Sequence, residues 1–421
     1  MNNRKNYRGT HILAENHVFS TDTWETGTNN NVLVFGPTGS GKTRHYVRPN
    51  IVRSHESMII SDTKGNLCEE LGPYLQENGF RVLNVDFTDL KKGCGYNPLD
   101  YIRCDDRWNE QDILTLCSCL IEDGQKDDPY WSHAAKQYLA CLIGWVLDVL
   151  PEERHNLREV MHLLSLMDAD VFPALMEELS LIRPDSTAVL RWQAFRVISR
   201  AEKMDASIRG IVSTNLDPLC FDDACALYTK PGRIDFASLG RTKTALFLTI
   251  SDTDRSLDKL ADAFLTQALQ ILCRTADHDS PGQRLTVPVR FYLDDFATNL
   301  YIPDFDRIIS VIRSREISVS VILQSLSQLN SLYGKDRAAT ILNNCDRQLY
   351  LGGTDPDTVT YIAQRAGRIP ESIFALPVQK AYLLTRGAPP CLTEKYNPSR
   401  AEPAFDAPTA QPVPCVPSIT G

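Results

Sequence analysis

Continuous apolar runs alternate with helix-like segments in the first part of the chain. The runs NVLVFG, SMIISD and FRVLNVDF begin at residues 31, 57 and 80, and helical segments start between them at Lys42 and near Leu67. Strands that are apolar along their whole length and separated by helices are typical of a parallel sheet covered on both faces. The pattern therefore predicts an α/β core.

The middle of the chain follows a different periodicity. Between 98 and 219, apolar residues recur at helical spacing, most clearly in three segments that begin at Trp108, Trp131 and Leu157. Turn-forming sequences, GYNPLD and DPLCFDD, lie at the two ends of this region. We therefore predict an inserted all-α domain at 98–219.

Strand-like runs return after the helical region, namely TALFLTIS, VRFYLDD, SVSVILQS, RQLYLGG and KAYLLTRG. Residues 1–97 and 220–388 are therefore predicted to complete one mainly parallel sheet in a domain that is discontinuous in sequence. The remaining segment, 389–421, contains eight of the 24 prolines. Such a composition buries too little apolar surface to offset the entropy of ordering, so we predict a disordered tail.

Charge and composition limit the classes of function. The net charge of −9 argues against a protein coated with nucleic acid, so any contact with nucleic acid must be local. The longest apolar run, YLACLIGWVLDVL from Tyr138, is too short to cross a bilayer and is interrupted by Asp148. The N-terminal residues do not have the apolar stretch of a signal peptide. We therefore expect a cytoplasmic protein.

The sequence GPTGSGKT has the form of a phosphate-binding loop. It follows an apolar strand and precedes a helical segment, and the glycines let backbone N–H groups point inward around phosphate oxygens. Lys42 is expected to reach the β- and γ-phosphates and Thr43 to bind Mg²⁺. The alternative is a chance match in a glycine-rich turn. The predicted nucleotide-binding residues are Gly36, Pro37, Thr38, Gly39, Ser40, Gly41, Lys42 and Thr43.

Polar residues stand at the ends of two of the later predicted strands. Asp294 and Asp295 follow VRFYL, where a metal-supporting carboxylate and a water-orienting carboxylate are both needed for hydrolysis. The alternative is an aspartate cap of a following helix. Gln324 ends the strand of SVSVIL, and a strand-end amide can sense the γ-phosphate; the alternative is an exposed polar residue closing a strand.

Two arginines lie between these strand ends. Arg313 or Arg315 could reach the site of a neighbouring subunit and neutralise transition-state charge there. The alternative is that both are basic residues in the last turn of a helix, where they would complement its dipole.

Four stretches together resemble a known family. They are NVLVFGPTGSGKTRHYVRPNI, SDTKGNL, the long segment FYLDDFATNLYIPDFDRIISVIRSREISVSVILQSLSQLNSLYG, and NCDRQLYLGGTDPDTVTYIA. In this order they resemble the successive motifs of type IV secretion coupling proteins, the TraG/TraD-like ATPases of conjugation. The resemblance extends from about Val32 to Arg386.

This resemblance implies a RecA-like P-loop domain with an all-α domain, assembled as a homohexamer. It also implies ATP-driven passage of single-stranded DNA with its attached relaxase into a secretion channel at the inner membrane, with ATP and Mg²⁺ as cofactors. Lys42 and Thr43 then correspond to the phosphate and Mg²⁺ contacts, Asp294 to the Walker B carboxylate, Gln324 to the strand-end glutamine and Arg313 to the trans-acting arginine.

The sequence also differs from the family pattern. Family members usually carry membrane-spanning helices before the nucleotide domain, and no stretch of this sequence can serve as one. We therefore expect either a shortened chain or one that docks at the inner face of the cell membrane through the secretion machinery. Asp295 stands where the family usually has Glu, and the side chain is one methylene shorter. Because a small displacement can cost about a hundredfold in rate, hydrolysis is expected to be slow or to need activation. In contrast, Asp62 and Lys64 agree with the family pattern, because both lie in the second-strand motif SDTKGNL.

Two other functions compete with this one. An FtsK- or HerA-like translocase would act on double-stranded DNA, but the large helical insertion disfavours it. A nucleotide-gated adaptor would recruit secretion substrates with little hydrolysis, and Asp295 is the feature in its favour.

Overall fold

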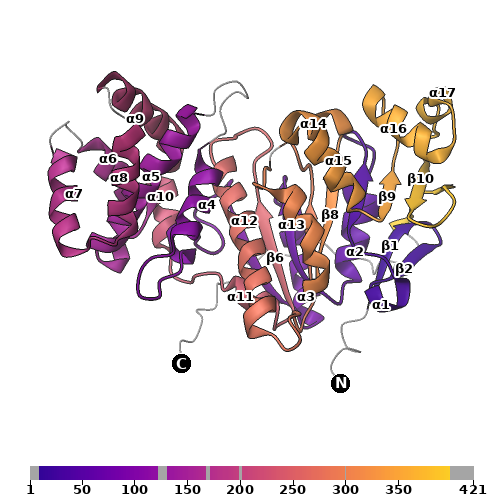
Figure 1. Cartoon of the computed structure of the whole chain (residues 1–421). Helices are drawn as coiled ribbons and strands as arrows, with labels where there is room; N and C mark the ends of the chain where they lie inside the picture. Colours follow the sequence, from indigo (N-terminus) through magenta and orange to yellow (C-terminus); the bar gives the residue numbers. More distant parts are fainter. Residues whose placement is uncertain (1–8, 122–129, 167–170, 199–201, 299, 399–421) are drawn as a thin grey trace. The chain divides into compact units, whose positions relative to one another are not determined.

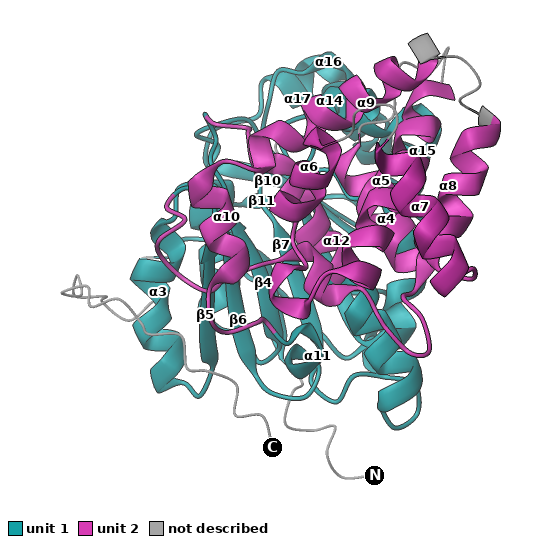
Figure 2. Ribbon diagram, turned by 90° about the vertical axis from the view of Figure 1, so that its left-hand side faces the viewer, with its two compact units in different colours: residues 1–88, 235–253, 268–413 teal, residues 89–234, 254–267, 414–421 magenta. Residues whose placement is uncertain are grey.

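The computed structural model of the 421-residue chain describes residues 9–121, 130–166, 171–198, 202–298 and 300–398. The chain divides into two compact units, which Figure 2 shows in different colours. The first consists of residues 1–88, 235–253 and 268–413, and the second of residues 89–234, 254–267 and 414–421.

The first unit contains a nine-stranded sheet with the order β11-β10-β9-β3-β8-β7-β4-β6-β5. The seven strands from β9 to β5 are parallel to their neighbours, whereas β10 and β11 are antiparallel. Strands from both sides of the helical region therefore share one sheet. Their bounds are β3 Val32–Phe35, β4 Ser57–Asp62, β5 Arg81–Asp86, β6 Thr244–Thr249, β7 Val289–Leu293, β8 Ile317–Leu323, β9 Arg347–Tyr350, β10 Lys380–Thr385 and β11 Cys391–Glu394.

Helices cover both faces of this sheet, with α2 and α3 on one face and α13, α14 and α15 on the other (Figure 1). Leu67, Leu71 and Leu75 of α3 are spaced by one helical turn and pack into the core with Met58 and Ile60 of β4. The helical bounds in this unit are α1 Thr23–Thr26, η2 Thr43–Val47, α2 Arg48–Val52, α3 Asn66–Glu77, α11 Phe236–Leu239, η6 Thr275–Asp279, α13 Phe305–Val311, η7 Ile312–Arg315, α14 Leu326–Tyr333, α15 Lys335–Asn343, α16 Pro356–Ala366 and α17 Pro370–Phe374.

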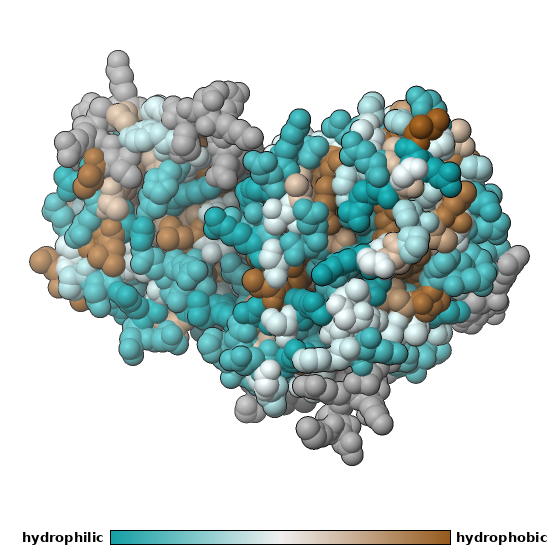
Figure 3. Space-filling view, turned by 45° about the vertical axis from the view of Figure 1, so that its right-hand side comes forward, coloured by the Kyte–Doolittle hydropathy of each residue, from teal (hydrophilic) through white to brown (hydrophobic). Residues whose placement is uncertain are grey.

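Two short strands, β1 (Thr10–Ala14) and β2 (His17–Ser20), form a separate antiparallel hairpin that the sequence patterns did not predict. Its turn contains Asn16, which has a left-handed φ of 60°. On the face shown in Figure 3, hydrophilic side chains predominate and apolar ones form small, separate groups.

The second unit is helical. Its central helix, α5 (Tyr130–Val149), packs against α4, α8 and α9. Within the described residues, no helix is both long enough and apolar enough to span a membrane. The other bounds are η3 Pro98–Tyr101, α4 Glu110–Leu120, η4 Glu152–Arg154, α6 Leu157–Ser165, α7 Val171–Ile182, α8 Thr187–Ile198, α9 Glu202–Leu216, η5 Asp217–Leu219 and α10 Asp222–Thr229, while α12 (Asp258–Arg274) is divided between the two units.

The second unit extends beyond the predicted all-α domain at both ends. Tyr228 donates a hydrogen bond to the carbonyl of Leu219 at 2.7 Å, and Tyr101 donates one to the carbonyl of Ile234 at 3.1 Å. These contacts attach Tyr228 and Ile234, which follow residue 219, to the helical unit. The division into independently folding domains stays a prediction.

The prediction of a disordered tail from residue 389 onward is wrong for its first part. Residues 391–394 form β11, which pairs with β10 from Lys380↔Glu394 to Leu383↔Cys391. Pairing with β10 satisfies backbone groups that a disordered chain would leave to water, so the strand forms despite the neighbouring prolines. Residues 399–421 lie outside the described part of the chain.

Candidate nucleotide site

The strand order brings several strand ends to one edge of the sheet. In the order β3-β8-β7-β4, Phe35 pairs with Leu323, and Leu293 pairs with Val321, all in parallel register. The carboxyl ends of parallel neighbours meet at the same edge. The residues that follow these strands therefore lie together, and they include both predicted carboxylates.

The predicted phosphate-binding loop connects β3 to a helical segment in which η2 runs directly into α2. Gly39 and Gly41 have φ values of +80° and +88°, in the left-handed region that favours glycine. A Cβ atom on Gly41 would also lie 2.2 Å from Cδ2 of His45. These two glycines therefore permit the tight curl of the loop.

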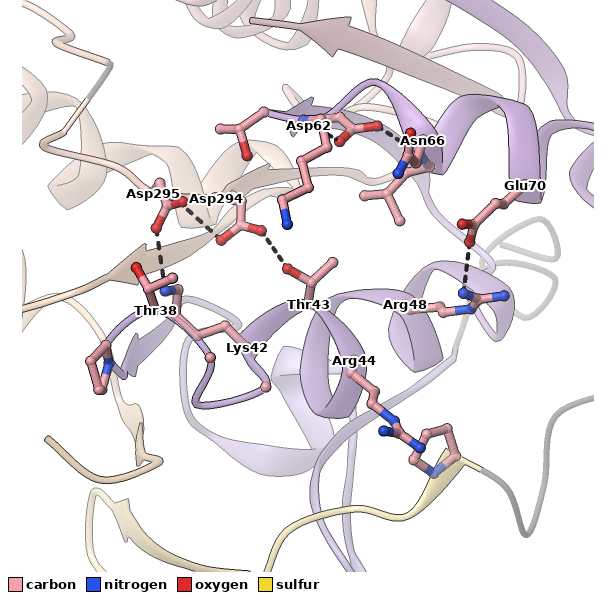
Figure 4. A pocket seen from close by; sticks show the side chains of 17 residues that line it. Thr38, Lys42, Thr43, Arg44, Arg48, Asp62, Asn66, Glu70, Asp294 and Asp295 are labelled. Atoms are coloured by element: carbon pink, nitrogen blue, oxygen red, sulfur yellow. Dashed lines mark hydrogen bonds and ion pairs between the residues drawn. The ribbon is translucent and has the colours of Figure 1, made fainter. Parts of the chain in front are cut away.

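The loop lines a cavity of about 830 Å³ (Figure 4). Of the eight predicted loop residues, six line this cavity: Pro37, Thr38, Gly39, Gly41, Lys42 and Thr43. Gly36 and Ser40 contribute through their carbonyl groups, which accept hydrogen bonds from Lys42 Nζ at 3.0 Å and Lys395 Nζ at 2.9 Å. Six of the eight predicted residues thus line the cavity, and the other two accept hydrogen bonds from lysine side chains.

Lys42 meets the predicted hydrolytic residues at one end of the cavity. Its Nζ lies 3.3 Å from Oδ1 of Asp295, and the side chain is only 8% exposed. Gln324 Nε2 donates a hydrogen bond of 3.2 Å to the same Asp295 oxygen. Three residues from three separate segments of the chain, Lys42, Asp295 and Gln324, therefore meet at one point.

Thr43 and Asp294 form a second pair in the same cavity. Thr43 Oγ1 donates a hydrogen bond of 2.9 Å to Oδ2 of Asp294, and the Asp295 N–H donates one of 3.0 Å to Oδ1 of Asp294. Ser61 on β4 accepts a hydrogen bond of 2.7 Å from the Asp294 N–H. This role of Ser61 could not be predicted from the sequence, because it depends on β4 lying next to β7.

The pKa of Asp294 is raised to about 6, first by burial and then by the neighbouring charge of Asp295. The hydrogen bond from Thr43 and the charge of Lys42 act in the opposite direction. Because this pKa lies above the ordinary value of 3.8, the native state binds more protons than the unfolded state between these two pH values. Ionised Asp294 therefore lowers the free energy of unfolding above pH 6, unless a cation compensates the charge.

The chain leaves β7 through an unusual backbone turn. Asp295 and Ala297 have φ values of 50° and 69°, a region that non-glycine residues seldom adopt. The turn is held by two hydrogen bonds, from the Phe296 N–H to the Ile322 carbonyl and from the Thr298 N–H to the Asp295 carbonyl. Such backbone strain, of about 1–3 kcal/mol per residue, concentrates at functional sites.

The opposite wall of the cavity comes from the end of β4 and the start of α3. Asp62 accepts hydrogen bonds from the N–H groups of Lys64 at 3.1 Å and Leu67 at 2.7 Å, and burial raises its pKa. Asp62 therefore holds the loop before α3 in shape, while Lys64 lines the cavity. Arg48 and Glu70, which the sequence did not single out, form an ion pair of 2.7 Å beside it (Figure 4).

The two candidate arginines lie outside the cavity lining. Arg315 forms a two-pronged ion pair with Asp277, with N–O distances of 2.8 and 2.9 Å. Arg313 is exposed on η7. Only Arg313 therefore remains suited to act on another molecule.

A family model described as Type IV secretory system Conjugative DNA transfer matches residues 2–374. The chain belongs to this family. Protein VirD4 of Rhizobium radiobacter is 25% identical over 346 residues, a match that covers 80% of this chain and 48% of VirD4. The chain thus spans about half the length of the curated relatives it matches.

Solved structures of one coupling protein share the fold of this chain. Plasmid coupling protein TrwB in complex with the ATP analogue ADPNP aligns with a TM-score of 0.65 and 19% identity, covering 90% of this chain and 88% of that chain. TrwB in complex with ADP and Mg²⁺ aligns with a TM-score of 0.63 and 18% identity, covering 87% and 85%. The predicted RecA-like P-loop fold is confirmed.

Proposed function

We propose that this chain is the ATP-hydrolysing subunit of a conjugative DNA-transfer machine. It would assemble as a homohexamer, recruit single-stranded DNA carrying a relaxase, and move it into a type IV secretion channel at the inner membrane. The carrying observation is that the two key loop residues each contact one of the carboxylates that follow β7: Lys42 contacts Asp295, and Thr43 contacts Asp294.

The contacts support separate roles for the side chains around the phosphates. Lys42 would bind the β- and γ-phosphates in place of part of its contact with Asp295. Asp295 would then orient or deprotonate the attacking water, and Gln324, which already bonds to Asp295, would respond to the γ-phosphate. Because the Asp295 carboxylate reaches within 3.3 Å of Lys42, the shorter side chain extends to the phosphate end of the site. This reach favours a hydrolase over a non-hydrolysing adaptor.

The residues present fit a bound Mg²⁺. Thr43 Oγ1 and Asp294 Oδ2 lie 2.9 Å apart, and both are the hard oxygen donors that Mg²⁺ prefers. These two residues would hold the ion, which would supply positive charge to the phosphate oxygens. Its binding would also compensate the ionised Asp294 carboxylate, whose burial is otherwise unfavourable. The nucleotide and Mg²⁺ in the TrwB complexes support this assignment.

The experiment that tests this function is ATP turnover of the purified chain without DNA, with single-stranded DNA and with double-stranded DNA of matched sequence. We expect turnover to depend on Mg²⁺ and to rise severalfold with single-stranded DNA. A rise with double-stranded DNA alone would instead indicate an FtsK- or HerA-like translocase. Nucleotide binding without turnover under any of these conditions would reject the motor and leave the adaptor.

The proposed ring gives a role to Arg313. In a hexamer its exposed guanidinium could neutralise charge in a neighbour's site, so Arg313→Ala should lower turnover severalfold. Mixing Arg313→Ala with Lys42→Ala subunits should restore part of the turnover, because the second variant supplies an intact Arg313 to the first.

Arg315→Ala is the matched control, since its side chain is already paired with Asp277 within the same chain. Mixing Arg315→Ala with Lys42→Ala subunits should therefore not raise the turnover of the Arg315→Ala subunits. Equal behaviour of the two arginine variants in this mixing experiment would count against a trans-acting Arg313.

A further inference from the structure

The chain that follows β11 is fastened to the first unit at several points. The Glu15 N–H donates a hydrogen bond of 3.0 Å to the Glu394 carbonyl, and the Lys395 N–H donates one of 2.9 Å to the Gln379 carbonyl. The Asn397 N–H donates one of 3.1 Å to Glu15 Oε2. Backbone contacts on both sides of the segment therefore set the path of residues 395–398, which we call the strap.

The first strap residue contacts the back of the phosphate-binding loop. Lys395 Nζ donates a hydrogen bond of 2.9 Å to the carbonyl of Ser40, and Lys395 is only 7% exposed. Ser40 lies between Gly39 and Gly41, the two loop residues with left-handed φ. A loop that points its N–H groups toward phosphate must point carbonyl groups outward, and a buried ammonium group stabilises such a carbonyl. Lys395 is thus placed to hold the loop in its phosphate-binding form.

The second strap residue contacts the helix that follows the loop. His45 Nδ1 donates a hydrogen bond of 2.7 Å to the carbonyl of Tyr396, and the guanidinium of Arg53 lies 5.9 Å from the Tyr396 ring centroid. His45 in turn packs so closely on Gly41 that no Cβ could fit between them. The strap therefore contacts the chain on both sides of Gly41.

The last strap residue borders the cavity itself. Pro398 is buried and lines the cavity, as does Arg44. In Figure 4, Arg44 lies on the far side of Thr43 from Asp295. If the terminal phosphate lies at Asp295 and Lys42, the nucleoside must extend toward the other end of the cavity, where Arg44 and Pro398 are found.

We propose that the strap, Lys395–Pro398, is part of the nucleotide site, with Lys395 as a positioning residue for the phosphate-binding loop and Pro398 as a boundary for the nucleoside. This inference rests on the proposed function. It makes ATP affinity depend on a segment that is remote in sequence from the loop, because Lys395 and Ser40 are 355 positions apart.

The test compares Lys395→Met with Lys380→Met in the full chain. Methionine keeps the length and apolar stem of lysine but removes the donor. Lys380 is a matched control, because it lies on the same hairpin and its partly exposed ammonium group pairs with Glu394 at 3.1 Å. We expect Lys395→Met to raise the Kd of a fluorescent ATP analogue and the KM for ATP about tenfold, as expected for loss of one charged hydrogen bond, with kcat within about twofold. Lys380→Met should leave all three values unchanged.

Three results separate the outcomes. If the unchanged chain binds no ATP analogue, the proposed function fails and the strap fails with it. If the unchanged chain binds and Lys395→Met binds equally well, only the strap is rejected. Thermal unfolding without nucleotide identifies a purely structural role of Lys395. In that case Lys395→Met would lower the melting temperature and leave the Kd for the ATP analogue unchanged. Lys395→Gln, which keeps a shorter donor, should give an intermediate Kd and would serve if the methionine variant does not fold.

Discussion

ATP turnover by Lys42→Ala is expected to fall at least about a thousandfold below that of the unchanged chain. The Lys42 ammonium lies at the end of the cavity that we propose holds the terminal phosphate, 3.0 Å from the Gly36 carbonyl and 3.3 Å from Asp295. Alanine removes the charge that would stabilise the transferring phosphate. It also leaves Asp295 beside Asp294 without a compensating cation. Steady-state phosphate release at saturating Mg²⁺ and ATP measures this effect.

The matched control for this variant is Lys335→Ala. Lys335 is exposed at the start of α15 and does not line the cavity, so its removal should change turnover by less than about twofold. Comparable losses in the two variants would mean that turnover responds to general charge or stability. Full turnover by Lys42→Ala would show that hydrolysis does not occur at this loop.

Strands were predictable from sequence where they are buried on both faces. The runs of β3, β4 and β7 are mainly apolar and every residue in them is buried, so hydrophobicity marks them even though β7 contains Arg290. The short strands β2 and β11 carry no such signal, because each is partly exposed and contains polar residues. Their formation depends on a partner strand, β1 or β10, and a single-segment pattern does not contain that information.

The proximity of the candidate site residues was predictable because they share one sheet edge, whereas their roles stay predictions. Lys42, Thr43, Asp294, Asp295 and Gln324 all follow strands or the loop at the carboxyl edge, and the structure brings them within hydrogen-bonding distance. Ser61 and Lys395 could not be found in this way. Their roles come from the order of the strands and from the path of the chain after β11. Arg313 is a different case, because its proposed partner is a second copy of the chain.

Asp295→Asn is expected to lower kcat about a thousandfold while leaving the affinity for ATP unchanged or stronger. Asparagine has the same size and can keep the contact with Gln324, but it cannot accept a proton from water. In the ligand-free site the Asp295 charge partly neutralises Lys42 at 3.3 Å, so its removal leaves more positive charge for the phosphates. Turnover and the Kd of a fluorescent ATP analogue, measured on the same preparation, separate the two effects.

The neighbouring pair of carboxylates makes this prediction specific to Asp295. Asp294 contacts Thr43 and is assigned to the metal, so its loss should weaken Mg²⁺-dependent binding as well as turnover. Asp336→Asn, an exposed change on α15, controls for the loss of one negative charge. A parallel loss of affinity and kcat in Asp295→Asn would make Asp295 a binding or structural residue. In that case another group would have to orient the attacking water.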